Sequence, residues 1–174
     1  MSTSSPASRI QANLQELFKG NSASGNSYIK FQLTPEIPAL LSMEPVQETL
    51  IVEAGQITPL PSMPKSVIGI MNSRDRVFCV FDLAQLLTLP SKLIAPRQYQ
   101  IIVLQTTSET PIQFGLAVNS VQGIMRLATE QIQSSTDTVS SQIAPYISGA
   151  VNVEKITIPV LGFDRIAQAL ETLL

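Results

Sequence analysis

From residue 28 onward this chain consists of short apolar segments, the first of which alternates between apolar and polar residues with a period of two. The segment from Tyr28 to Leu33 alternates as a half-buried strand does. Many short strands separated by Pro, Gly, Ser or Asn are typical of sandwiches and small barrels, so we expect a mainly β fold. The other apolar runs lie at 39–43, 50–52, 67–71, 77–81, 101–104, 112–118, 121–127 and 156–161.

Near the N-terminus the period changes to that of a helix. The apolar residues fall on one helical stripe, which predicts a short amphipathic helix followed by a flexible polar linker at 20–27. This helix either packs on the main body or serves as a free docking peptide. The stripe consists of Ile10, Leu14, Leu17 and Phe18.

Two more helices interrupt the β pattern. Asp82 is placed to cap a short helix at 83–87, which Pro90 would stop. Asp164 is placed to cap a helix that continues to Leu173.

Part of the sequence is repeated after about eighty residues. Residues 68–72 (IGIMN) and the pair Phe81-Asp82 return as 148–152 (SGAVN) and Phe163-Asp164. Two copies are too few for a solenoid, so the repeat predicts two related lobes. We expect the boundary between them near 88–98, where prolines bound a linker.

The composition favours a binding protein over an enzyme. Only 14% of the 174 residues are charged, against about 25% in a typical soluble domain. Such a neutral surface is cheap to desolvate in protein–protein contacts, and the net charge of −2 provides no electrostatic footprint for nucleic acid. No stretch approaches the roughly 18 apolar residues that cross a bilayer, and no secretory signal begins the chain, so we expect a cytoplasmic protein.

Several kinds of catalytic chemistry are absent from the sequence. There is no histidine, which removes the common acid–base and nucleophile systems and most zinc sites. No phosphate-binding glycine motif is present, and the acidic residues show no metal-ligand spacing. The single cysteine, Cys79, alternates with apolar neighbours and is expected in a strand core. We therefore predict no enzymatic activity, no cofactor and no metal.

One polar segment, residues 72–75 (NSRD), separates two apolar runs. Asn72 and Asp75 are explained by a tight turn, because both tolerate left-handed backbone. Arg74 is not needed for such a turn. An arginine at a rigid hairpin tip can bind a carboxylate or carbonyl groups of a partner, so Arg74 is a candidate contact.

The run from 60 to 87 (LPSMPKSVIGIMNSRDRVFCVFDLAQLL) resembles the signature of CheW-type chemotaxis adaptors, in which prolines lead into a G-x-x-N-L-R-G turn and a strand ending in Val-Asp-Leu. Three further segments resemble the same family in the same order: 45–50 (PVQETL), 115–127 (GLAVNSVQGIMRL) and 146–166 (YISGAVNVEKITIPVLGFDRI). The resemblance covers residues 28–174. The chain departs from the family at Ser73 and Asp75, where Leu and Gly are usual, and at Asn119, where Asp is usual.

The resemblance implies a fold and its division. It implies two small SH3-like β-barrels, each five-stranded, with a groove between them and short helices. We place an N-terminal segment at 1–27 and a CheW-like domain at 28–174. Within that domain we expect lobe 1 at about 28–90, lobe 2 at about 97–162 and a C-terminal helix at 164–173.

The resemblance also implies partners and site residues. CheW-type adaptors bridge the cytoplasmic tip of a chemoreceptor and the regulatory domain of a CheA-type histidine kinase, in flagellar chemotaxis, pilus-driven motility or phototaxis. Such a protein would be recruited to membrane receptor arrays through its partners. The positions that match the family's receptor groove are Val46, Glu48, Asn72, Arg74 and Val121. The apolar positions that would contact the kinase are Leu40, Leu41 and Met43.

Two other functions compete with the adaptor. A small β-barrel can bind nucleic acid or oligosaccharide, but aromatic residues make up only 5% of the chain and the net charge is negative. An enzyme that uses carboxylates alone would need acids clustered in a cleft. For Val46 and Val121, ordinary strand packing is the alternative to receptor contact.

Overall fold

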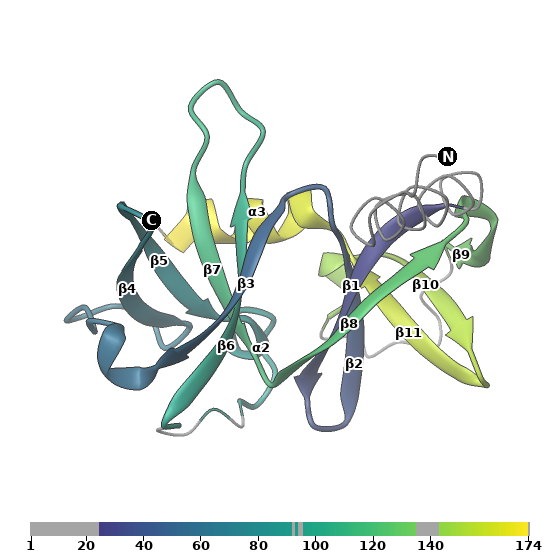
Figure 1. The fold of residues 1–174 in the computed structure, drawn as a ribbon. Coiled ribbons are helices and arrows are strands. Elements are labelled where there is room, and N and C mark those ends of the chain that lie inside the picture. Colours follow the sequence, from purple (N-terminus) through teal and green to yellow (C-terminus); the bar gives the residue numbers. More distant parts are fainter. Residues whose placement is uncertain (1–24, 92, 94–95, 135–142, 174) are drawn as a thin grey trace, which may run out of the picture.

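The computed structural model describes residues 25–91, 93, 96–134 and 143–173, and these form two β-sheets (Figure 1). The six-stranded sheet has the order β8-β1-β2-β11-β10-β9 and the five-stranded sheet the order β3-β6-β7-β5-β4. The strands of the first are β1 (Asn26–Thr34), β2 (Ile37–Ser42), β8 (Ser120–Leu127), β9 (Ile132–Gln133), β10 (Ile147–Val153) and β11 (Ile156–Leu161). Those of the second are β3 (Val46–Glu53), β4 (Val67–Ser73), β5 (Arg76–Asp82), β6 (Gln98–Gln105) and β7 (Gln113–Val118).

The helical elements are short. The α-helices are α2 (Leu83–Leu86) and α3 (Phe163–Leu173), and the 3-10 turns are η1 (Ala54–Gln56), η2 (Thr129–Gln131) and η3 (Ala144–Tyr146). The mainly β fold with short helices is thus confirmed, with two sheets in the place of the two expected barrels. The expected N-terminal helix at 10–18 lies outside the described residues.

The sheets do not follow the predicted division at 88–98. The six-stranded sheet combines residues 26–42 with 120–161, and the five-stranded sheet is built from 46–118. The assignment of 28–90 and 97–162 to separate lobes was therefore wrong. The reason is long-range pairing: β1 pairs with β8, and β2 pairs in parallel with β11. The count of five strands holds for one sheet only.

The sequence repeat is a repeat of structure, with a constant offset of 80 residues. The hairpin β4–β5 has a register shift between Val67 and Gly69, and the hairpin β10–β11 has one between Ile147 and Gly149. Both hairpins have two-residue turns, at 74–75 and 154–155, whose residues all have positive φ. Such turns match the right-handed twist of paired strands.

With an offset of 80, the first residues of the two helices do not correspond in the way that the sequence predicted. Asp82 caps α2, because the Gln85 amide donates to its carboxylate at 3.4 Å. The structural counterpart of Asp82 is Gly162 and not Asp164. Helix α3 begins at Phe163, and the Ile166 amide donates to the Gly162 carbonyl at 3.1 Å. Asp164 thus lies inside the first turn, where its charge suits the positive end of the helix dipole.

A second repeat, with an offset of 75 residues, supplies the segment through which each sheet bends round to its own far edge. It relates 46–58 (VQETLIVEAGQIT) to 121–133 (VQGIMRLATEQIQ). In each copy a strand leads into a 3-10 turn that a glutamine side chain holds, Gln56 in η1 and Gln131 in η2. The chain then reaches the far edge of the same sheet, where Thr58 bridges to Ile70 and Gln133 pairs with Ala150.

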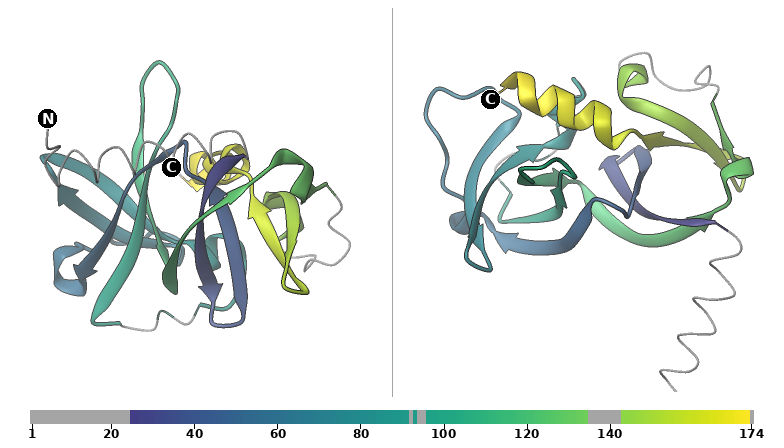
Figure 2. Two further views of the ribbon diagram at one scale, coloured as in Figure 1. Left: turned by 45° about the vertical axis from the view of Figure 1, so that its right-hand side comes forward. Right: turned by 90° about the horizontal axis from the view of Figure 1, so that it is seen from above.

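Three apolar cores result from this arrangement. One fills the inside of each curled sheet, and the third lies between the sheets. The two faces of a central strand pack into two different cores. In β6, Ile101 and Val103 face the inside of the five-stranded sheet, while Ile102 and Leu104 face the core between the sheets. Helix α3 extends from the end of β11 across the five-stranded sheet, as the right-hand view of Figure 2 shows, and buries Ile166 and Leu170 in that shared core.

Candidate functional site

One end of the five-stranded sheet carries a ring of polar side chains. Each strand contributes one residue on the face that elsewhere holds the inner core, since side chains on one face of a strand recur every second residue. Glu48 continues the row of Leu50 in β3, and Arg76 continues the row of Phe78 in β5. The ring consists of Glu48, Ser73, Arg76, Gln105 and Gln113, and together with Gln47 and Arg74 it lines a hollow of about 520 Å³. We call this hollow the polar mouth.

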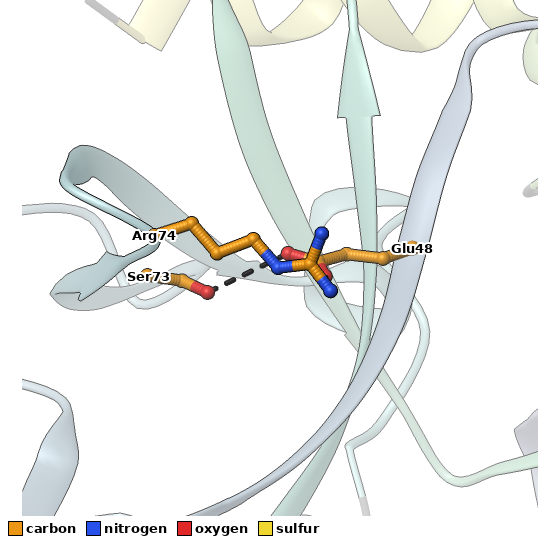
Figure 3. A network of polar contacts seen from close by, with 3 residues as sticks. All are labelled: Glu48, Ser73 and Arg74. Carbon is orange, nitrogen blue, oxygen red and sulfur yellow. Dashed lines mark hydrogen bonds and ion pairs between the residues drawn. The ribbon is translucent and has the colours of Figure 1, made fainter.

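Two of the predicted groove residues meet in the polar mouth. Arg74 Nη2 lies 3.3 Å from Glu48 Oε2, and Ser73 Oγ donates to Glu48 Oε1 at 3.5 Å (Figure 3). Strands β3 and β4 are the two edges of their sheet, so these contacts join the edges across the mouth. The Arg74 side chain is 82% exposed and that of Glu48 is 16% exposed. A pair this exposed adds little to stability, which leaves Arg74 available to a partner.

The turn geometry explains how Arg74 is presented. Arg74 and Asp75 have φ of 52° and 62°, as the two central residues of a type I′ turn require. The turn forms although neither residue is glycine. Asp75 tolerates this region better than most residues, whereas Arg74 adopts it at some cost. The carboxylate paired with Arg74 is that of Glu48 and not that of its neighbour Asp75.

Asn72 lies outside the polar mouth. Because Ser73 points into the mouth, its neighbour Asn72 points to the opposite face of β4, where it is exposed. The structure therefore separates Asn72 from Glu48 and Arg74, although the three were predicted to line one groove.

Val46 and Val121 occupy equivalent positions in the two sheets. Each stands opposite a buried core residue, Leu104 for Val46 and Phe31 for Val121, and each is followed by a register shift. Both are half-buried against the core between the sheets. The Val121 amide donates to Gln100 Oε1 at 2.8 Å. Val46 thus lies beside Leu104 of β6, and Val121 lies beside Gln100 of the same strand. These two residues are four apart, so the valines are separated by about 13 Å along β6.

Two of the predicted kinase contacts are completely buried. Leu40 and Leu41 are both 0% exposed. Strand β2 lies between β1 and β11, so Leu40 fills the inner core of the six-stranded sheet and Leu41 the core between the sheets. Their assignment as surface contacts was wrong, because a run of apolar residues does not reveal that both faces are covered. Met43 follows β2 and is half-buried.

The chemistry around the polar mouth is that of recognition. It holds one carboxylate, two guanidinium groups, a hydroxyl and three amides, which are hydrogen-bonding and charge-pairing groups.

Burial raises the pKa of the Cys79 thiol, which makes the reactive thiolate harder to form. Cys79 lies elsewhere, beside α3 in an apolar groove. No cluster of metal-ligating side chains, and no helix long and apolar enough to cross a membrane, occurs in the described parts of the chain.

Of the seven residues that line the polar mouth, sequence reasoning named Glu48 and Arg74; it missed Gln47 and Ser73, which adjoin them, and three further residues. Arg76, Gln105 and Gln113 come from different strands and share no local motif. The available signal was weak: each is the polar residue at one end of an apolar strand. Only the pairing of β6 with β7 and of β7 with β5 brings them together.

Comparison with known proteins gives three consistent matches. The family model described as the CheW-like domain matches residues 27–171. A protein named chemotaxis protein CheW, from Thermotoga maritima, is 27% identical over 119 residues, which cover 68% of this chain and 74% of that protein. The crystal structure of the scaffolding protein TtCheW from Thermoanaerobacter tengcongensis superposes with a TM-score of 0.67, covering 80% of this chain and 90% of the other. At 19% identity, the last match shows likeness of fold.

Proposed function

The chain belongs to the CheW-like domain family, and from this premise we propose that it is a non-catalytic adaptor that couples chemoreceptors to a CheA-type histidine kinase. Its similarity to a protein named for chemotaxis supports this role. In this role the chain contributes binding surfaces and brings two other proteins together. It would act in the cytoplasm and reach membrane receptor arrays through its partners.

The contact between Glu48 and Arg74 is the observation that carries the proposal. The two residues match the family's receptor-contact positions, are 26 residues apart in sequence, and are joined at 3.3 Å at the rim of one hollow. The exposed Arg74 stands on a hairpin tip whose position the turn fixes. We assign the receptor tip to this rim, with the half-buried Val46 and Val121 as apolar contacts where the two sheets meet.

The kinase contact is assigned to Met43, at the far side of the receptor residue Val46, whose amide donates to the Met43 carbonyl at 3.1 Å. Of the three apolar residues expected there, Met43 keeps an exposed part, and it follows β2 at the end of the six-stranded sheet. An adaptor must hold both partners at once, so the two surfaces can adjoin at Met43 and Val46 but cannot overlap. We therefore propose that the kinase regulatory domain binds beside Met43 and leaves the polar mouth free.

Simultaneous binding is the test of an adaptor. The full chain should form binary complexes with a chemoreceptor cytoplasmic fragment and with a kinase regulatory domain, and a ternary complex when all three are mixed. Size-exclusion chromatography with light scattering measures each mass. Competition between the two partners, or binding of neither, would overturn the proposal. Co-purification from the native cell then identifies which receptor and kinase, and so which of flagellar, pilus-driven or light-guided movement, the adaptor serves.

A further inference from the structure

Arg76 holds a position in the polar mouth that differs from that of Arg74. It is the first residue of β5, pairs with Ser73 across the hairpin, and points along the inner face of the sheet. Its Nη1 donates to Gln105 Oε1 at 3.3 Å, across the intervening strand β7. Its guanidinium is therefore directed over the hollow, whereas that of Arg74 lies at the rim.

The two arginines also differ in charge compensation. Arg74 is paired with the Glu48 carboxylate, but Arg76 contacts the neutral amide of Gln105. Within the described part of the chain no carboxylate lies within ion-pair distance of Arg76. A guanidinium has five N–H donors, and the contact with Gln105 uses one of them. The uncompensated positive charge of the polar mouth thus belongs to Arg76.

Gln113 also lines the hollow, beside Gln105. The side-chain oxygen of Gln113 is buried and has no hydrogen-bond partner among the described residues. Gln113 pairs with Gln105 in the sheet, so this oxygen and the guanidinium of Arg76 belong to neighbouring positions of the ring. A buried acceptor without a donor costs free energy, so this oxygen adds nothing that compensates the charge of Arg76.

We propose that Arg76 is a specificity-determining residue that binds a carboxylate of the receptor segment entering the polar mouth. This inference rests on the proposed adaptor function. The planar fork of an arginine matches the two oxygens of a carboxylate, which a lysine ammonium cannot reproduce. Arg76 thereby selects for an acidic side chain in the receptor, and Arg74 and Glu48 form the rim around it.

The test compares Arg76→Gln with Arg76→Lys and with Arg97→Gln in the full chain, each titrated against a chemoreceptor cytoplasmic fragment at low and at physiological salt. Arg97 is an exposed arginine that precedes β6, at the end of the sheet opposite the polar mouth, and serves as the matched control. We expect Arg76→Gln to weaken binding about tenfold or more and to reduce its salt dependence. Arg76→Lys should keep the salt dependence but recover only part of the affinity, and Arg97→Gln should bind as the unaltered protein does.

Each other outcome has a distinct meaning. If the unaltered chain does not bind the receptor fragment, the proposed function fails, and this inference fails with it. If the unaltered chain binds and Arg76→Gln binds equally well, only the role of Arg76 is overturned. Equal losses in Arg76→Gln and Arg97→Gln would show a general charge effect and would also overturn it. The Arg76→Lys variant retains the charge, so full affinity in this variant would exclude recognition by the guanidinium fork.

Discussion

The two sheets repeat one backbone plan, with β3-β6-β7-β5-β4 in one and β8-β1-β2-β11-β10 in the other, but their equivalent ends carry different residues. Strand registers relate the five positions of the polar mouth to five positions in the six-stranded sheet. There, Gly123 replaces Glu48, and the Arg76 position holds Ile156, which is 57% exposed. The polar set Glu48, Ser73, Arg76, Gln105 and Gln113 corresponds to Gly123, Val153, Ile156, Gln32 and Pro38.

This difference separates what the fold needs from what the site needs. Both sheets keep the register shift, the two-residue turn and the glutamine-held 3-10 turn, so these features maintain the fold. Four of the five end residues differ although the backbone is the same, with glutamine kept at 32 and 105, so no shared folding requirement fixes those four. A polar end selects partners through charge and hydrogen bonds, whereas an apolar end selects through shape and burial. An adaptor with two different partners benefits from this asymmetry.

The largest expected effect concerns the core that the two sheets share. Leu170 is 4% exposed and packs there from α3, so Leu170→Ala should lower the free energy of unfolding by about 2–5 kcal/mol. Chemical denaturation measures the change. Gln168→Ala, on the exposed face of the same helix, is the control and should change it little. A loss below about 0.5 kcal/mol for Leu170→Ala would mean that α3 does not join the sheets.

Gly69 and Gly149 lie where each sheet closes onto its far edge, and we expect these two positions to tolerate an added methyl group differently. A Cβ on Gly69, which has φ of 158°, would lie 2.2 Å from the Thr58 carbonyl oxygen. The same atom on Gly149 would lie 2.6 Å from the Ile132 side chain and 2.9 Å from the Gln133 carbonyl oxygen, so its closest backbone contact is 0.7 Å longer than that of Gly69. We expect Gly69→Ala to cost about 3 kcal/mol and Gly149→Ala about 1 kcal/mol in thermal or chemical unfolding. Equal costs would show that the two closures are built alike.

The sequence predicted the local features of this fold better than its pairing. Short apolar runs, and alternation at 28–33, located the strands, and Asp82 was correctly placed as a helix cap, because these signals lie within a few residues. The partner of a strand is not a local property: Leu40 pairs with Val160, which no pattern near either residue indicates. For the same reason, complete burial of Leu40 and Leu41 could not be foreseen, since it depends on the neighbours of β2 on both sides.

The candidate site was likewise predictable only in part. Glu48 and Arg74 were assigned to one groove, and the structure places them in contact. The repeat at 46–58 and 121–133 is visible in the sequence and would have shown that Val46 and Val121 are equivalent. The remaining members of the polar mouth are ordinary Arg and Gln residues. They become a site only when three strands align them in register.

A smaller effect concerns the unused acceptor of the polar mouth. Replacing Gln113 by Leu removes a buried oxygen that has no donor among the described residues and keeps a similar volume. We expect Gln113→Leu to raise the free energy of unfolding by about 1 kcal/mol, because the desolvation cost of that oxygen disappears. Denaturation in urea measures the change. A loss of stability would instead show that Gln113 has a polar partner in the free protein.

The most direct test of the central claim compares the two hairpin tips. Arg74→Ala and its counterpart Glu154→Ala should both leave the melting temperature nearly unchanged, because both side chains are exposed. Each variant is then titrated against a chemoreceptor cytoplasmic fragment and against the kinase regulatory domain. We predict that Arg74→Ala weakens receptor binding by about tenfold or more and leaves kinase binding intact, while Glu154→Ala leaves receptor binding unchanged. Equal loss of both partners in Arg74→Ala, or receptor binding that depends on Glu154 and not on Arg74, would contradict the assignment of the receptor to the polar mouth.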